Sequence, residues 1–127
     1  MQARRARAFD AARPAAVARR RKSGQRTARE NIEDLCDPGS FLEYGGLTVA
    51  ARRTTTSIEQ LVDESPADGF VMGLAQINGD QFAEDASRVV VGAYDYTVMA
   101  GTQGKKSHAK QDRMYEIAES WRLPTVI

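Results

Sequence analysis

The chain has 127 residues, of which 42% are hydrophobic and 28% charged, and its formal net charge is +1. These values predict one domain or part of one and exclude a chain that is disordered throughout. No apolar run is long enough for a transmembrane helix, and the N-terminus lacks the apolar segment of a secretory signal. A single cysteine, Cys36, and a single histidine, His108, argue against an internal disulfide and a metal site. We therefore expect a soluble, cytoplasmic protein without a bound metal.

Charge is distributed unevenly along the chain. Residues 1–30 carry ten basic side chains against Asp10 and Glu30, whereas residues 31–127 carry 8 basic and 15 acidic side chains. A basic arm on an acidic body fits nucleic acid, an anionic ligand or the acidic surface of the body itself. We expect neither nucleic acid nor a membrane as a partner, because Phe9 is the arm's only aromatic residue and no recognition motif occurs. A solvated helix is the simpler interpretation.

The first half of the chain predicts two helices and two short strands. Pro14 suits the first turn of a helix over residues 14–22, which Gly24 ends. Thr27 and Glu30 form a capping box, which predicts a second helix. Its apolar stripe is Ile32, Leu35 and Cys36, and the turn at residues 37–40 ends it. Strands are predicted over residues 41–44 and 47–50.

Residues 52–68 are polar and are expected to form a surface insertion, with a helical turn over residues 57–62. The three carboxylates at its end are expected to be solvated, and these are Asp63, Glu64 and Asp68. Strands are predicted over residues 70–77 and 88–94, joined as a hairpin through Asn78 and Gly79. The second strand is almost continuously apolar, as in a strand that is buried on both faces.

Residues 107–121 predict a helix with Met114, Ile117, Ala118 and Trp121 on its apolar face. A further strand is predicted over residues 123–127, and a βαβ unit makes it the parallel neighbour of residues 88–93. The fold class is therefore α/β. Because this strand has only begun at Ile127, we expect the natural chain to be longer.

The loop Gly101-Thr-Gln-Gly104 precedes Lys105 and Lys106 and opens a helix. A Walker loop is excluded because the required upstream glycine is replaced by Met99. Two interpretations are open: an anion site at the helix N-terminus with lysines nearby, or a tight structural turn. His108 with Asp112 is expected to be a surface pair, and a Cys36–His108 dyad is the least favoured hypothesis.

Several short motifs follow one another along the chain in a characteristic order. They are Ala12-Arg-Pro-Ala-Ala-Val-Ala-Arg-Arg20, Thr27-Ala-Arg-Glu30, Leu35 with Asp37-Pro-Gly-Ser-Phe-Leu-Glu43, Asp68-Gly-Phe-Val71, Gln76-Ile-Asn-Gly79, Asp95-Tyr-Thr-Val98, Gly101-Thr-Gln-Gly104, His108-Ala-Lys-Gln-Asp-Arg-Met114 and Leu123-Pro124. Together they resemble the N-terminal part of the carboxyltransferase subunit, or beta chain, of biotin-dependent acyl-CoA carboxylases of the acetyl-, propionyl- and methylcrotonyl-CoA group. The sequence differs from that family at the glycine loop, which is followed by Lys105, and at Asn31, where arginine is commoner.

The resemblance implies a crotonase-like (ClpP/crotonase) fold, of which this chain would be the N-terminal portion with a helical arm. Residues 1–26 would be the basic arm and residues 27–127 an incomplete N-terminal carboxyltransferase domain. The family moves a carboxyl group from carboxybiotin to an acyl-CoA and holds the enolate oxyanion at glycine turns. Those turns would lie beyond Leu123-Pro124 and in a second domain, so no catalytic residue is assigned and no turnover is expected of this chain alone.

The resemblance also places CoA near the 101–110 segment. The implied CoA contacts are Gly101, Thr102, Gly104, Lys105 and Lys110, and residues 19–22 would face CoA or a partner subunit. Biotin would be carried on a partner chain or domain, with biotin carboxyl carrier and biotin carboxylase components as partners in an oligomer. The alternative is a non-catalytic interaction module that pairs with an intact carboxylase through its terminal strand or its arginine-rich helix.

Overall fold

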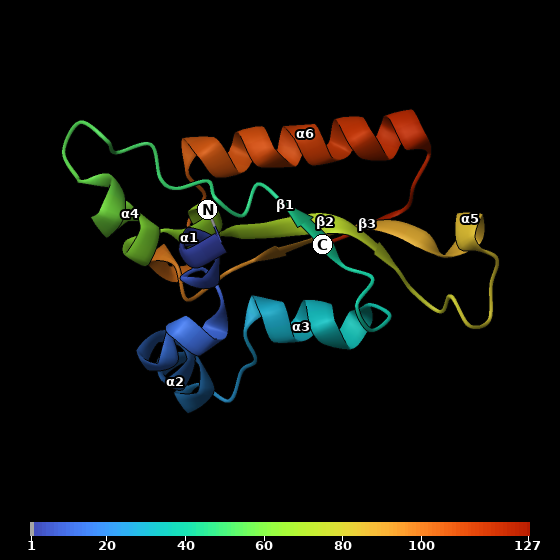
Figure 1. Cartoon of the computed structure of the whole chain (residues 1–127), viewed down its shortest axis with the longest axis horizontal. Coiled ribbons are helices and arrows are strands. Elements are labelled where there is room, and N and C mark those ends of the chain that lie inside the picture. Colours follow the sequence, from blue (N-terminus) through green and yellow to red (C-terminus); the bar gives the residue numbers. More distant parts are fainter. Residues whose placement is uncertain (1) are drawn as a thin grey trace.

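A four-stranded sheet lies between two helices in the computed structural model, which describes residues 2–127 (Figure 1). The strands are β1 (Leu42–Tyr44), β2 (Phe70–Gln76), β3 (Arg88–Tyr94) and β4 (Thr125–Val126). They lie in the order β1-β2-β3-β4, with β1, β2 and β3 antiparallel and β4 parallel to β3. The predicted parallel pairing is confirmed, since Val90 faces Thr125 and Val91 faces Val126.

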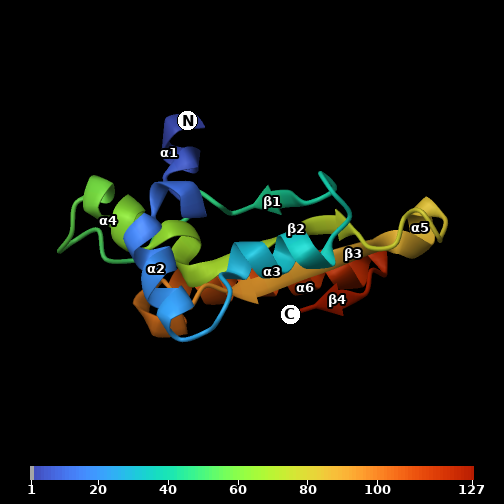
Figure 2. The ribbon, with the colours of Figure 1, turned by 90° about the horizontal axis from the view of Figure 1, so that it is seen from below.

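Two of the predicted helices cover opposite faces of the sheet, α3 (Ala28–Leu35) on one and α6 (Lys105–Trp121) on the other (Figures 1 and 2). The α3 face buries Ile32, Cys36, Val71, Ala75, Val89 and Val91. The α6 face buries Phe70, Met72, Val90, Met114 and Ala118. Alternate residues of β2 and β3 therefore enter different clusters, as the side-chain alternation of a strand requires.

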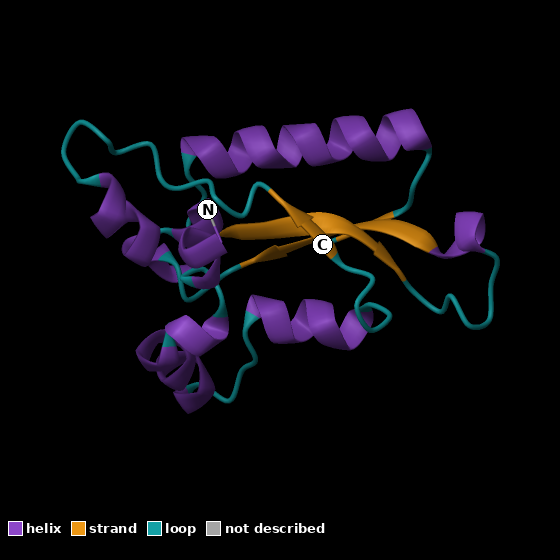
Figure 3. Ribbon diagram, in the orientation of Figure 1, coloured by secondary structure: helices purple, strands orange, loops and turns teal. Residues whose placement is uncertain are grey.

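Shorter helices lie at the two ends of the sheet (Figure 3). At one end lie α1 (Gln2–Ala6), α2 (Pro14–Lys22) and α4 (Ile58–Glu64), and α5 (Glu84–Ser87) lies at the other. Single 3-10 turns are η1 (Asp10–Ala12), η2 (Pro66–Gly69) and η3 (Met99–Gly101). No helix within residues 2–127 has both the length and the apolar character needed to cross a membrane.

Several local predictions are confirmed. Pro14 occupies the first turn of α2, and Thr27 and Glu30 form the complete capping box of α3. The hairpin pairs Phe70 with Tyr94 through Gln76 with Arg88. Its connection contains α5, however, so the strands are joined by more than the turn at Asn78.

Other predictions are wrong. Residues 47–50 form no strand; Val49 and Ala50 instead bury a small cluster with Leu61 and Val62 of α4. The segment 52–68 is therefore not only a surface insertion. Leu35 and Trp121 are exposed, although helical spacing placed both on apolar faces.

The basic arm is bound to the acidic body by individual arginines. Arg7 pairs with exposed Asp63 at 2.5 Å, and Arg13 pairs with buried Asp95 at 3.1 Å. Arg4 donates to the backbone carbonyl of Leu47 at 2.8 Å. Of the three interpretations of the charge asymmetry, pairing with acidic groups of the body accounts for the contacts of Arg7 and Arg13.

Candidate functional site

The glycine loop follows a strained turn at the end of β3. Asp95 holds the start of this turn, because its Oδ1 accepts the amide and the hydroxyl of Thr97 at 2.9 and 2.5 Å. Three consecutive residues of η3 then have left-handed backbone, with φ of 48° at Met99, 54° at Ala100 and 75° at Gly101. For L residues this conformation costs about 1–2 kcal/mol each, so surrounding contacts must hold it.

The N-terminus of α6 is occupied by a carboxylate of the protein itself. Asp68 is 3% exposed, and its Oδ2 accepts the Ser107 amide at 2.7 Å. A Cβ added at Gly104 would lie 2.8 Å from that oxygen, so glycine makes room for Asp68. The expectation that Asp68 is solvated is wrong, because it takes the position where a bound anion would meet this helix.

Lys110 lies inside the molecule. Its Nζ donates to the backbone carbonyls of Ala67, at 2.7 Å, and Phe70. Burial lowers the pKa of Lys110 to about 8, and the charges of Glu43 and Asp68 oppose that shift. The amine therefore fastens the turn before β2, whereas the other four predicted CoA contacts lie in the 101–105 segment.

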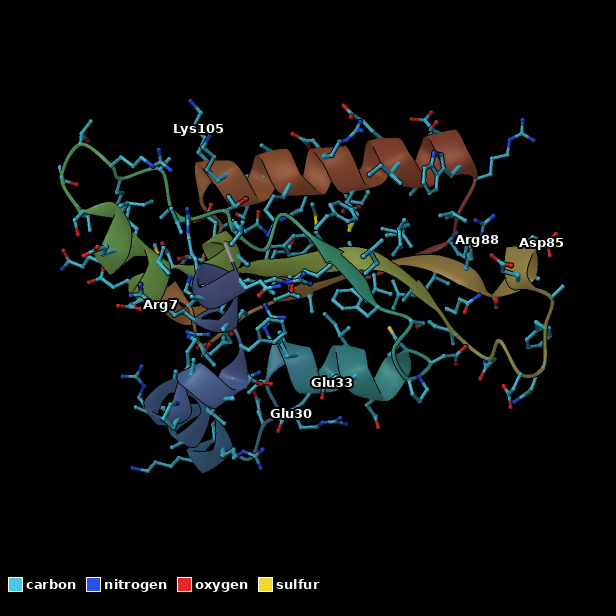
Figure 4. The ribbon with its side chains drawn as sticks, in the orientation of Figure 1. Arg7, Glu30, Glu33, Asp85, Arg88 and Lys105 are labelled. Atoms are coloured by element: carbon cyan, nitrogen blue, oxygen red, sulfur yellow. The ribbon has the colours of Figure 1, made fainter. Side chains whose placement is uncertain are left out.

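The remaining predicted contacts form one continuous surface. Thr102 and Lys105 are exposed, as is the neighbouring Lys106, and Gly101 and Gly104 are half-buried. Lys105 extends away from the sheet at the start of α6 (Figure 4). The Thr102 hydroxyl donates to the Met99 carbonyl at 2.8 Å, which keeps the loop close to η3.

A basic and aromatic groove runs beside this loop. A cavity of about 410 Å³ lies between α2 and the turn after β3, and its lining includes Arg19, Arg20, Tyr96 and Met99. The Arg20 guanidinium lies 4.8 Å from the centroid of the Tyr96 ring, a cation–π distance. The same ring contacts Gly101, where a Cβ would lie 3.1 Å from Tyr96. Tyr96 thus connects the groove to the loop.

Sequence reasoning missed both Asp68 and Tyr96 as parts of this site. The only local signal for Asp68 was its position beside Gly69, immediately before an apolar strand. Tyr96 follows Asp95 at the end of β3, where turn residues often carry binding groups. Neither signal identifies a partner, because Ser107 lies 39 residues after Asp68.

The Cys36–His108 dyad is excluded by the fold. Cys36 is buried at the end of α3, whereas His108 is exposed on α6, which covers the other face of the sheet (Figure 1). Burial also raises the pKa of the Cys36 thiol, which disfavours the reactive thiolate. Within residues 2–127, no group of three or more His, Cys, Asp and Glu side chains is placed to hold a metal ion.

Comparison with known proteins places this geometry in a family. The family profile described as "Carboxyl transferase domain" matches residues 19–127. The propionyl-CoA carboxylase beta chain of Saccharopolyspora erythraea is 34% identical over 111 residues, which are 87% of this chain and 18% of that protein. The biotin-dependent long chain acyl-coenzyme A carboxylase beta4 subunit of Mycobacterium tuberculosis is 38% identical over 101 residues, 80% of this chain and 16% of that protein.

Solved structures agree with the sequence relatives. A single-chain, multi-domain long-chain acyl-CoA carboxylase matches with a TM-score of 0.93 and 55% identity, over 96% of this chain and 12% of that one. The transcarboxylase 12S subunit, solved as a hexamer with hydrolysed methylmalonyl-CoA bound, matches with a TM-score of 0.71 and 32% identity over 87% of this chain and 20% of that one. The fold is therefore crotonase-like, as expected, and the chain spans less than a fifth of the curated relatives' length.

Proposed function

This chain belongs to the carboxyl transferase domain family, and from that premise we propose that it supplies CoA-binding elements of an acyl-CoA carboxyltransferase. The reaction moves a carboxyl group from carboxybiotin to an acyl-CoA of the acetyl- or propionyl-CoA type. The proposed contacts are Gly101, Thr102, Gly104 and Lys105. Lys110 would support them from inside the molecule, where its amine holds the turn before β2. Residues 1–26 would serve as a basic arm on a carboxyltransferase body formed by residues 27–127.

The observation that carries the proposal is one glycine loop with two exposed lysines after it and a basic, aromatic groove beside it. CoA combines phosphate groups with a planar adenine ring. Lys105 and Lys106 offer positive charge to phosphates, and the Arg20–Tyr96 pair offers a charged, planar surface. Tyr96 contacts Gly101, so the groove adjoins the glycine loop that precedes the two lysines.

Biotin has no assigned residue in this proposal. It would be carried on a partner chain or domain, where it supplies the transferable carboxyl group. Biotin carboxyl carrier and biotin carboxylase components would be the partners, within an oligomer. The transcarboxylase 12S relative is described as a hexamer in a multienzyme core, which supports that expectation.

The test is calorimetric titration of the chain with CoA. We expect the double substitution Lys105→Glu, Lys106→Glu to weaken binding at least about fivefold, because two attractive charges become repulsive. Arg88→Glu is the matched control: it reverses an exposed charge far from Lys105 (Figure 4) and should leave the dissociation constant within about twofold. Equal affinities of the wild type and the double variant would contradict the proposal.

A second candidate function is a non-catalytic module that pairs with an intact carboxylase. It is favoured by the large exposed side chain of Trp121 at the end of α6. This candidate predicts co-purification with a carboxylase together with no affinity for CoA. Measurable CoA binding by the chain alone would exclude it.

A further inference from the structure

Two left-handed turns pack against each other at the start of α6. Residues 67–69 have φ of 54°, 49° and 72°, and residues 99–101 form the second such run. A Cβ at Gly69 would lie 3.4 Å from Val98 and 3.8 Å from the Thr102 carbonyl oxygen, so the first turn supports the second. Non-glycine residues in this conformation are held only where the surroundings over-determine them.

Two buried charged side chains tie these turns to α6. Asp68, in the first turn, accepts the Ser107 amide at 2.7 Å, which fixes the first helical turn. Lys110, one turn further along α6, donates to the carbonyls of Ala67 and Phe70 on either side of Asp68 and Gly69. The 67–69 turn and α6 are therefore joined twice, once by a side chain of the turn and once by a side chain of the helix.

We propose that Asp68 and Lys110 are positioning residues for the 101–106 loop, a role that rests on the proposed CoA function of that loop. Lys110 fixes the 67–69 turn, and Asp68 in that turn fixes the helix start from which Lys105 and Lys106 project. Asp68 also acts as an internal anion at the helix N-terminus. Ligand phosphates accordingly meet the lysine side chains and not the Ser107 amide.

Three variants test the inference in the full chain. Asp68→Gly removes the carboxylate, and glycine adopts φ near 49° without strain. Asp68→Asn retains an acceptor oxygen and tolerates the same backbone. Lys110→Met removes the amine while retaining a similar apolar length. Asp80→Gly, in the exposed turn after Asn78, is the matched control.

The first measurement is amide hydrogen exchange over residues 102–107. Loss of the charged hydrogen bond in Asp68→Gly should accelerate the Ser107 amide about tenfold or more, with a smaller increase in Asp68→Asn. Lys110→Met should accelerate the same segment more than the C-terminal half of α6. Unchanged exchange in Asp68→Gly and Lys110→Met would overturn the inference, and Lys110→Met alone decides it where Asp68→Gly does not fold.

The second measurement is rescue by an external anion, which a purely structural carboxylate would not show. Inorganic phosphate at about 50 mM should raise the Tm of Asp68→Gly by a few degrees relative to chloride of equal ionic strength. The wild type and Asp80→Gly should show no such difference. A phosphate effect of equal size in all three proteins would overturn the internal-anion role.

CoA titration of the same variants separates this inference from the proposed function. Affinity should fall in Asp68→Gly and be largely restored in Asp68→Asn. If the wild type binds no CoA, the proposed function fails, while exchange and phosphate rescue still decide whether Asp68 and Lys110 position the loop. If the wild type binds CoA and Asp68→Gly binds equally well, the positioning role fails alone.

Discussion

Arg29 and Glu43 form a buried, bidentate ion pair, with N–O distances of 3.1 and 3.0 Å, between α3 and β1. The Arg29 Nε also donates to the Ala8 carbonyl at 3.1 Å, and its guanidinium lies 4.3 Å from the Phe9 ring centroid. The Arg29 side chain thus joins the N-terminal arm, α3 and the sheet. Each of the two charges depends on the other, because the side chains of Arg29 and Glu43 are only 9% and 4% exposed to water.

Removing one member of this pair should destabilise the fold strongly. Arg29→Met leaves the Glu43 carboxylate buried without its partner, which costs about 3–5 kcal/mol of unfolding free energy. The double variant Arg29→Met, Glu43→Leu should cost less than the sum of the single variants. Urea unfolding measures the free energy of unfolding of Arg29→Met, of Glu43→Leu and of the double variant. The control is Arg113→Met, which breaks an exposed pair with Glu116 and should cost less than about 1 kcal/mol.

Stability should increase with pH because of Lys110. Its pKa is about 8 in the folded chain and 10.5 when unperturbed, so between these values the unfolded chain binds more protons. Unfolding free energy should therefore rise from about pH 8 to about pH 10.5, by up to about 3 kcal/mol. Lys110→Met should remove this increment from the pH profile of urea unfolding. Parallel profiles for the two proteins would refute this explanation.

The capping box of α3 should contribute more than an ordinary N-cap. The Thr27 hydroxyl accepts the Glu30 amide at 3.1 Å and donates to Asp10 at 2.5 Å, and the residue is buried. Thr27→Ala should cost about 1–2 kcal/mol. Ser57→Ala, at the exposed N-cap of α4, should cost about 0.5–1 kcal/mol. Thermal unfolding compares them, and equal losses would argue against the added role of Asp10.

Gly104→Ala should destabilise the chain through crowding and not through backbone conformation. Its Cβ would approach the Asp68 carboxylate, at a cost of about 1–3 kcal/mol. Gly24→Ala is the contrast, because Gly24 has φ of 71° with open space around it and should cost about 1 kcal/mol. In an Asp68→Gly background the penalty at position 104 should disappear. Its persistence there would show that Asp68 is not the crowding group.

Local signals in the sequence were sufficient for most of the secondary structure. Three kinds of signal act within a few residues and can therefore be recognised from the sequence. They are Pro14, the Thr27–Glu30 capping box and the apolar runs of β2 and β3. The parallel placement of β4 also followed, because a strand–helix–strand unit permits few arrangements. The ordered motifs then predicted the family, which the comparison confirmed.

Only the tertiary structure decided which charges are internal. Asp68 resembled its solvated neighbours Asp63 and Glu64 until the fold placed it against Ser107, and Lys110 resembled Lys105 and Lys106 until the fold placed its amine on Ala67 and Phe70. Within each of these two groups the residues are alike in charge and lie within a few positions of one another, so the sequence does not distinguish them. What separates the members is burial against partners about 40 residues away in sequence, and that long-range contact has no local signature.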